Sequence, residues 1–213
     1  MTNNRNYPYN PYAQNLGDPQ CRHNICFSGG SKGADQLFGE LADAEGHSVF
    51  HWSFQNHHSC GRESQTQVLP AVKLLEADLH LNVANEYLDP NFPTRSEYVN
   101  NLLRRNYYQI HVSERIYASC AFDDDMKPLG GTAWAIIMGI NQNINEVWVF
   151  DHTRDQWYSF ERKYYQTNQR QADEWWPIKL DSIPPPHGLY AGIGSSELPE
   201  NGRRAIRKLY EAR

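Results

Sequence analysis

The chain has 213 residues, of which 39% are hydrophobic and 21% are charged, a balance typical of a globular protein with a substantial core. Its formal net charge of −5 argues against a general duplex-DNA-binding protein, because such proteins neutralise phosphates with a basic face. No apolar run approaches the ~18 residues that span a bilayer, so no membrane association is expected. The four cysteines follow no metal-site or disulfide pattern, which is typical of reduced thiols in a cytoplasmic protein.

We expect residues 1–20 to be a polar arm and residues 21–213 to form a single domain. A strand over residues 23–27 leads into a loop with three glycines, followed by a helical pattern that stops at Gly46. A second strand over residues 47–54 completes a βαβ unit, which predicts a parallel sheet. Glycines allow close approach to a ligand and helix N-termini attract anions, so the loop predicts a phosphate site. Its candidate ligand-binding residues are Ser28, Gly29, Gly30, Lys32, Gly33 and Asp35.

A polar loop over residues 55–63 contains three potential zinc ligands, but no fourth ligand is visible, so a solvated loop is favoured over a metal site. The three are His57, His58 and Cys60. Residues 69–88 have a helical pattern that is broken into two pieces. The capping-box sequence over residues 94–97 then predicts that another helix begins near Arg95.

Over residues 95–110 the apolar and polar side chains separate onto two faces at 100° per residue. The expected buried face consists of Val99, Leu102, Leu103 and Ile110. The opposite stripe consists of Glu97, Asn101, Arg104 and Tyr108, with Arg105 at its edge. Either this stripe is a solvated surface, or it lines the ligand cleft with Arg104 on a phosphate and Glu97 or Asn101 on a ribose.

The C-terminal half repeats the order of strand, glycine turn and helix twice. A strand over residues 115–122 is followed by an acidic turn, Asp123–Asp125, for which a solvated loop is favoured over a cation site, and then by a glycine turn that opens a helix. The last strand, residues 188–193, enters a similar turn before the final helix. The carboxyl ends of parallel strands meet at one edge of a sheet, where ligands bind. The candidate residues of these turns are Gly130, Gly131, Thr132, Gly194, Ser195 and Ser196.

Between these two units the pattern is less regular. A strand is expected over residues 146–150, with a possible hairpin to residues 156–160. Residues 164–186 are rich in proline and aromatic residues and are expected to be irregular, covering part of the domain. Within them, Trp175 and Trp176 either fill an apolar gap or stack on a base.

In their joint order these motifs resemble the SLOG superfamily, a Rossmann-like nucleotide-binding group that includes the LOG phosphoribohydrolases and DNA-processing protein A. The resemblance covers roughly residues 22–150 and 187–213, and it places Arg104-Arg105 where the family has an Arg-Lys pair. The family's first strand and helix stand here at the C-terminus, so the chain resembles a circularly permuted member, similar to the YpsA-related branch. It implies a permuted Rossmann-like α/β fold, and it requires the final helix to end close to the first strand.

The resemblance further implies a nucleotide or ADP-ribose-like ligand in a cleft of three glycine-rich loops, with its base against Trp134 or Tyr108. LOG hydrolases carry a Glu shortly after their last glycine loop, whereas residues 133–137 contain no acidic residue. We therefore expect a protein that binds its ligand in order to sense or sequester it. The alternative is a phosphoribohydrolase-like enzyme that uses Glu97 or Asp35 to cleave an N-glycosidic bond. No cofactor or metal is expected, and similar families suggest a homodimer or higher homo-oligomer.

Overall fold

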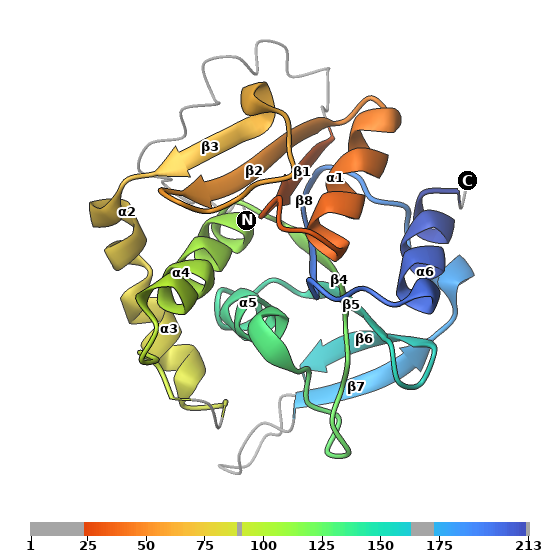
Figure 1. Cartoon of the computed structure of the whole chain (residues 1–213). Helices are drawn as coiled ribbons and strands as arrows, with labels where there is room; N and C mark the ends of the chain where they lie inside the picture. Colours follow the sequence, from red (N-terminus) through yellow and green to blue (C-terminus); the bar gives the residue numbers. More distant parts are fainter. Residues whose placement is uncertain (1–23, 89–90, 163–172, 212–213) are drawn as a thin grey trace, which may run out of the picture.

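The computed structural model describes residues 24–88, 91–162 and 173–211, so the expected arm over residues 1–20 lies outside the described part (Figure 1). The strands are β1 (Ile25–Ser28), β2 (Ser48–Phe54), β3 (Thr66–Leu69), β4 (Arg115–Cys120), β5 (Glu146–Asp151), β6 (Gln156–Arg162), β7 (Asp173–Ile178) and β8 (Leu189–Gly194). The helices are α1 (Ala34–Ala44), α2 (Ala71–Glu76), α3 (Asp78–Asn85), α4 (Glu97–His111), α5 (Gly130–Asn141) and α6 (Glu200–Glu211). None of these helices is both long and apolar enough to cross a membrane.

The eight strands form one sheet in the order β3-β2-β1-β8-β4-β5-β6-β7. The strands β3, β2, β1, β8, β4 and β5 are parallel to one another, and β6 and β7 continue the sheet beyond β5 as antiparallel strands. The predicted α/β fold with a largely parallel sheet is therefore confirmed. The expectation that residues 164–186 are irregular is wrong for β7, whose polar and bulky residues carry no clean alternation. Strand β3 was also not predicted, because it has only four residues ahead of a helical pattern.

Strand β8 comes last in the chain but lies in the middle of the sheet, between β1 and β4. When the short parallel strand β3 beside β2 is left out and the count starts from β8, the strands β8, β1, β2, β4 and β5 stand in the order 3-2-1-4-5, as in a Rossmann fold. Asn24, just before β1, and Tyr210, in the last turn of α6, line one hollow of about 350 Å³. The end of the final helix thus lies close to the start of the first strand, as a permuted chain requires.

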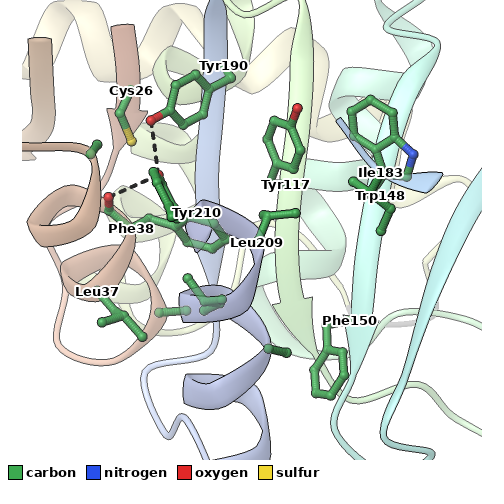
Figure 2. Close-up of a cluster of buried hydrophobic side chains, with 14 of the residues drawn as sticks. Cys26, Leu37, Phe38, Tyr117, Trp148, Phe150, Ile183, Tyr190, Leu209 and Tyr210 are labelled. Carbon is green, nitrogen blue, oxygen red and sulfur yellow. Dashed lines mark hydrogen bonds between the residues drawn. The ribbon is translucent and has the colours of Figure 1, made fainter. Parts of the chain in front are cut away.

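Helices cover both faces of the sheet (Figure 1). On one face α1 and α6 pack over a cluster that includes Phe38, Tyr117 and Leu209 (Figure 2). The Tyr210 hydroxyl in this cluster hydrogen-bonds to the Tyr190 hydroxyl at 3.0 Å and donates to the Phe38 carbonyl at 3.3 Å. On the other face, α5 packs over β4 and β5, with α4 against α5. The sheet is thus packed on both faces, and the glycine turns follow the carboxyl ends of its central strands β1, β8 and β4.

Helix α4 differs from its prediction at its start and on its faces. Its N-cap is Ser96, whose side-chain oxygen accepts from the Val99 amide, so the helix begins two residues later than expected. The predicted apolar face is confirmed for Leu103 and Ile110, which are at most 5% exposed, and is wrong for Val99, which is 39% exposed. The 100° pattern did not predict that polar and charged side chains of α4 are buried as well, because that burial depends on a polar site packed against the helix. The buried polar residues of α4 are Asn100, Arg104, Arg105, Asn106 and Gln109.

Candidate functional site

A cleft of about 670 Å³ opens at the carboxyl ends of β1, β8 and β4, with α4 forming one wall. This is the position at which open α/β sheets bind ligands, where the crossovers on either side run to opposite faces. Seven predicted site residues line the cleft: Asp35, Gly130, Gly131, Thr132, Gly194, Ser195 and Ser196. The lining also includes Ser31, Arg105, Asn106, Trp134 and His152. Turns from both ends of the chain therefore meet in one place.

The loop before α1 and the turn after β8 touch each other directly. The Ala34 amide donates to the Ser195 carbonyl at 3.0 Å, and the Gln36 amide donates to the Ser31 carbonyl at 3.0 Å. Gly33 has φ of +99°, and a Cβ there would lie 2.4 Å from the Ser196 carbonyl oxygen. Two backbone amides of the first turn of α1 therefore already donate to carbonyl groups of the protein, so fewer of them are available to bind a phosphate.

The N-terminus of α5 has a different environment. Its N-cap, Leu129, supplies no side-chain hydrogen bond to the first turn, and the glycines that follow line the cleft. Gly130 has φ of +71°, a conformation that favours glycine, while a Cβ on Gly131 would meet only Leu103 Cδ2 at 3.9 Å. The first-turn amides of α5 and its positive dipole end are thus presented to the cleft.

A buried ion pair between Asp35 and Arg105 forms the floor between the two loops. Arg105 Nη1 donates to Asp35 Oδ2 at 3.1 Å, Nη2 donates to Ser31 Oγ at 3.1 Å, and the side chains are 4% and 6% exposed. The Gly194 amide donates to Asp35 Oδ1 at 3.0 Å, which ties α1 to the end of β8. Burial raises the pKa of the Asp35 carboxyl, and the positive charge of Arg105 opposes that rise.

Two histidines beside this pair are held neutral. Burial, and then the charge of Arg105, lowers the pKa of His51 and of His57 to about 4. His57 hydrogen-bonds through Nε2 to Ser31 and through Nδ1 to Ser53, so it supports the loop. Among the described residues no cluster of His, Cys, Asp and Glu is arranged to hold a metal ion.

The structure places Arg104 outside the lining of the cleft. Its Nε and Nη2 donate to the Asp78 carboxylate at 2.6 and 3.0 Å, and its Nη1 donates to Glu97 and Asn101. Glu97 is 68% exposed in its side chain, and hydrogen bonds from Asn100 and then Arg104 lower its pKa. These predicted residues form a cluster between α3 and α4, and the cleft uses Arg105 in place of Arg104.

The remaining predicted residues of the first glycine loop support its shape. The Ser28 hydroxyl donates to the Asp35 carbonyl at 2.8 Å, and a Cβ on Gly29 would lie 0.9 Å from Arg105 Nη1. Gly30 packs against His51 and Ser59, and Lys32 is exposed on the loop. They do not line the cleft.

His152 is a cleft residue that the sequence pattern did not indicate. It follows β5, its Nε2 is 2.7 Å from Ser119 Oγ, and burial lowers its pKa. Of the two aromatic residues proposed for a base, Trp134 lines the cleft, whereas the Tyr108 hydroxyl donates to the Lys73 carbonyl on α2. The sequence feature that could have indicated His152 is its position just after a predicted parallel strand, at the end of the strand where ligands bind.

The chain was compared with protein-family models, with curated proteins and with solved structures, and none of the three comparisons found a match.

Proposed function

We propose that the cleft binds a small phosphate-bearing molecule of the nucleotide or ADP-ribose type, which the protein senses or sequesters. The observation that carries this proposal is the N-terminus of α5, which opens without a side-chain cap into a cleft that Arg105 also lines. Helix N-termini of this kind bind phosphate through backbone amides and the helix dipole. The lining also carries the acidic Asp35 and Glu197, so a ligand with few charges suits it better than a triphosphate.

The rest of the ligand fits the other walls. Leu102, Leu103 and Trp134 give the cleft an apolar side next to the α5 turn, suited to a nucleobase. The Thr132 and Ser195 side chains and His152 supply hydrogen-bonding groups for ribose hydroxyls or a second phosphate. This division into an apolar wall and a polar end supports a nucleotide-type ligand.

We further propose that the chain is a circularly permuted relative of the SLOG superfamily. The strand order counted from β8 and the closeness of Asn24 to Tyr210 support this assignment. The site departs from that family's hydrolases because residues 133–137 provide no acidic residue. A binding role is therefore preferred to catalysis.

A hydrolase that cleaves an N-glycosidic bond remains the second candidate, and one observation favours it. Asp35 is a buried carboxyl in the lining of the cleft with a raised pKa, a combination found in catalytic acids. Its bonds to Arg105 and Gly194 are a structural role that counts against this function.

Thermal unfolding with AMP, ADP, ATP and ADP-ribose, followed by chromatography of the recovered ligand, separates the two functions. A binding protein is stabilised and returns its ligand intact, whereas a hydrolase releases the base or ribose phosphate. If none of these compounds or their cyclic and deoxy derivatives shifts the unfolding temperature at millimolar concentration, the proposed ligand class is wrong.

A further inference from the structure

Asn106 on α4 is a buried asparagine in the lining of the cleft, and one end of its side-chain amide is bonded to α5. Its Nδ2 donates to the Gly131 carbonyl at 3.0 Å. This bond fixes the orientation of the amide, because the opposite orientation would set two acceptor oxygens against each other. Figure 1 shows α4 and α5 side by side, and Asn106 joins them at the first turn of α5.

The other end of this amide, Oδ1, faces the cleft. Asn106 is 9% exposed and lines the cleft, and its Oδ1 accepts no hydrogen bond from the residues that the structure describes. Nor is Oδ1 one of the polar atoms that are both sealed from solvent and without a partner, a group that includes Nε of Arg105. The oxygen is therefore open to a ligand in the cleft.

The groups around Oδ1 either are donors or are already bonded. The amides in the first turn of α5 have no acceptor within the helix and no side-chain cap. The Asp35 carboxylate receives hydrogen bonds on both of its oxygens, one from Arg105 and one from Gly194. Asn106 thus adds an available acceptor beside a row of donors.

We infer that Asn106 Oδ1 accepts a hydrogen bond from a ribose hydroxyl of the ligand and makes the cleft discriminate against nucleotides that lack this hydroxyl. The inference rests on the proposed function, in which the first turn of α5 binds a phosphate. An ionised phosphate presents only acceptor oxygens, so it cannot satisfy Oδ1. The donors that a nucleotide carries within a few bonds of its phosphate are its ribose hydroxyls, whereas the amino group of adenine lies at the far end of the molecule.

The same amide makes this selection strict. A nucleotide without the hydroxyl would cover Oδ1 and leave it buried without a partner, and such sites reject the analogue far more strongly than an apolar pocket rejects a missing methylene. Because Nδ2 is bonded to the Gly131 carbonyl, Oδ1 cannot turn away without losing that bond. Asn106 is therefore a specificity-determining residue of the cleft.

Calorimetric titration of the wild-type protein with AMP, 2′-deoxy-AMP and 3′-deoxy-AMP tests this assignment without relying on any variant. We expect one of the two deoxy compounds to bind at least ~10-fold more weakly than AMP, since it leaves the acceptor unpaired. Equal affinity for all three compounds would overturn the inference and leave the proposed function intact. Failure of AMP to bind would also overturn it, and titration with ADP-ribose decides separately whether the proposed function fails as well.

Substitution of Asn106 tests whether this residue reads the hydroxyl. Asn106→Leu keeps the size of the side chain without its polar atoms, so AMP and the weaker deoxy compound should bind it within ~2-fold of each other. Asn101→Leu is the matched control, because Asn101 lies on the same helix and its Oδ1 accepts from Arg104 outside the cleft. This control should keep the wild-type ratio of affinities. An unchanged ratio in Asn106→Leu with a native near-ultraviolet circular dichroism spectrum would refute the assignment.

Discussion

The guanidinium of Arg105 occupies the space where a side chain on Gly29 would have to lie. A Cβ built on Gly29 would be 0.9 Å from Arg105 Nη1 and 2.1 Å from its Cζ, while the same guanidinium reaches Asp35 and Ser31. Gly29 therefore serves a buried ion pair between α1 and α4. The first glycine loop is fixed in shape by this pair, which positions the cleft that the α5 turn completes.

We expect Gly29→Ala to lower the free energy of unfolding by about 2–4 kcal/mol, because the methyl group displaces a charged group that is already buried. Urea unfolding at neutral pH measures this loss. Gly131→Ala is the matched control, since a Cβ there has ordinary contacts, and its change should stay within ~0.5 kcal/mol. Equal stabilities of the two variants would contradict the close approach of Arg105.

Removing Asp35 leaves the Arg105 guanidinium buried without its counter-charge. We expect Asp35→Ala to lower the free energy of unfolding by about 3–5 kcal/mol. Arg105→Met should lower it by a similar amount, because the Asp35 carboxyl is then buried without its counter-charge. The double variant should lose clearly less than the sum of the two, giving a coupling energy of at least ~1 kcal/mol in a double-mutant cycle. Strict additivity would mean that the pair contributes nothing to the fold.

The lowered pKa of His51 predicts that the protein loses stability in acid. Because its pKa is lowered from 6.5 to about 4 in the folded state, its stabilising contribution is complete above pH 6.5 and is lost as the pH falls toward 4. At pH 5 this amounts to about 2 kcal/mol. His51→Gln should therefore lose less stability than the wild type between pH 7.5 and pH 5 in urea unfolding. An unchanged difference between the two pH values would refute the assignment.

The two neighbouring arginines should separate stability from ligand binding. Arg104→Met breaks its bonds to Asp78 and Glu97, so we expect it to cost about 1–3 kcal/mol of stability and to leave affinity for ADP-ribose within threefold. Arg105→Lys keeps the charge but loses the guanidinium fork beside the cleft, so affinity should fall at least ~10-fold. Calorimetric titration of both folded variants measures this, and the opposite ranking would favour Arg104 as the ligand residue.

The sequence was informative where local rules decide the structure. The strand and glycine turn before Ala34 and the helix that opens at Gly130 follow from glycine placement and apolar spacing. The return of the last strand to the middle of the sheet was implied by the family resemblance and not by these patterns. Parallel topology then brings the turns after β1, β4 and β8 together. This much of the cleft was therefore predictable before any coordinates.

What failed depends on contacts between distant segments. Periodicity could not tell Arg104 from Arg105, because both are buried and only their partners, Asp78 and Asp35, decide which faces the cleft. The capping-box sequence at residues 94–97 predicted a helix that begins near Arg95, but the residue that caps α4 is Ser96. Strand β7 pairs with β6, and the pattern of residues in β7 does not predict that pairing.

The most direct test of the central claim is a titration of Gly131→Asp with ADP-ribose by calorimetry. The carboxylate would sit in the first turn of α5, where it complements the helix dipole, so the unfolding temperature should stay the same or rise. It would also occupy and repel the proposed phosphate position, so affinity should fall at least ~30-fold relative to the wild type, while the neutral Gly131→Asn loses much less. If Gly131→Asp binds ADP-ribose as tightly as the wild type, the phosphate does not bind at the N-terminus of α5.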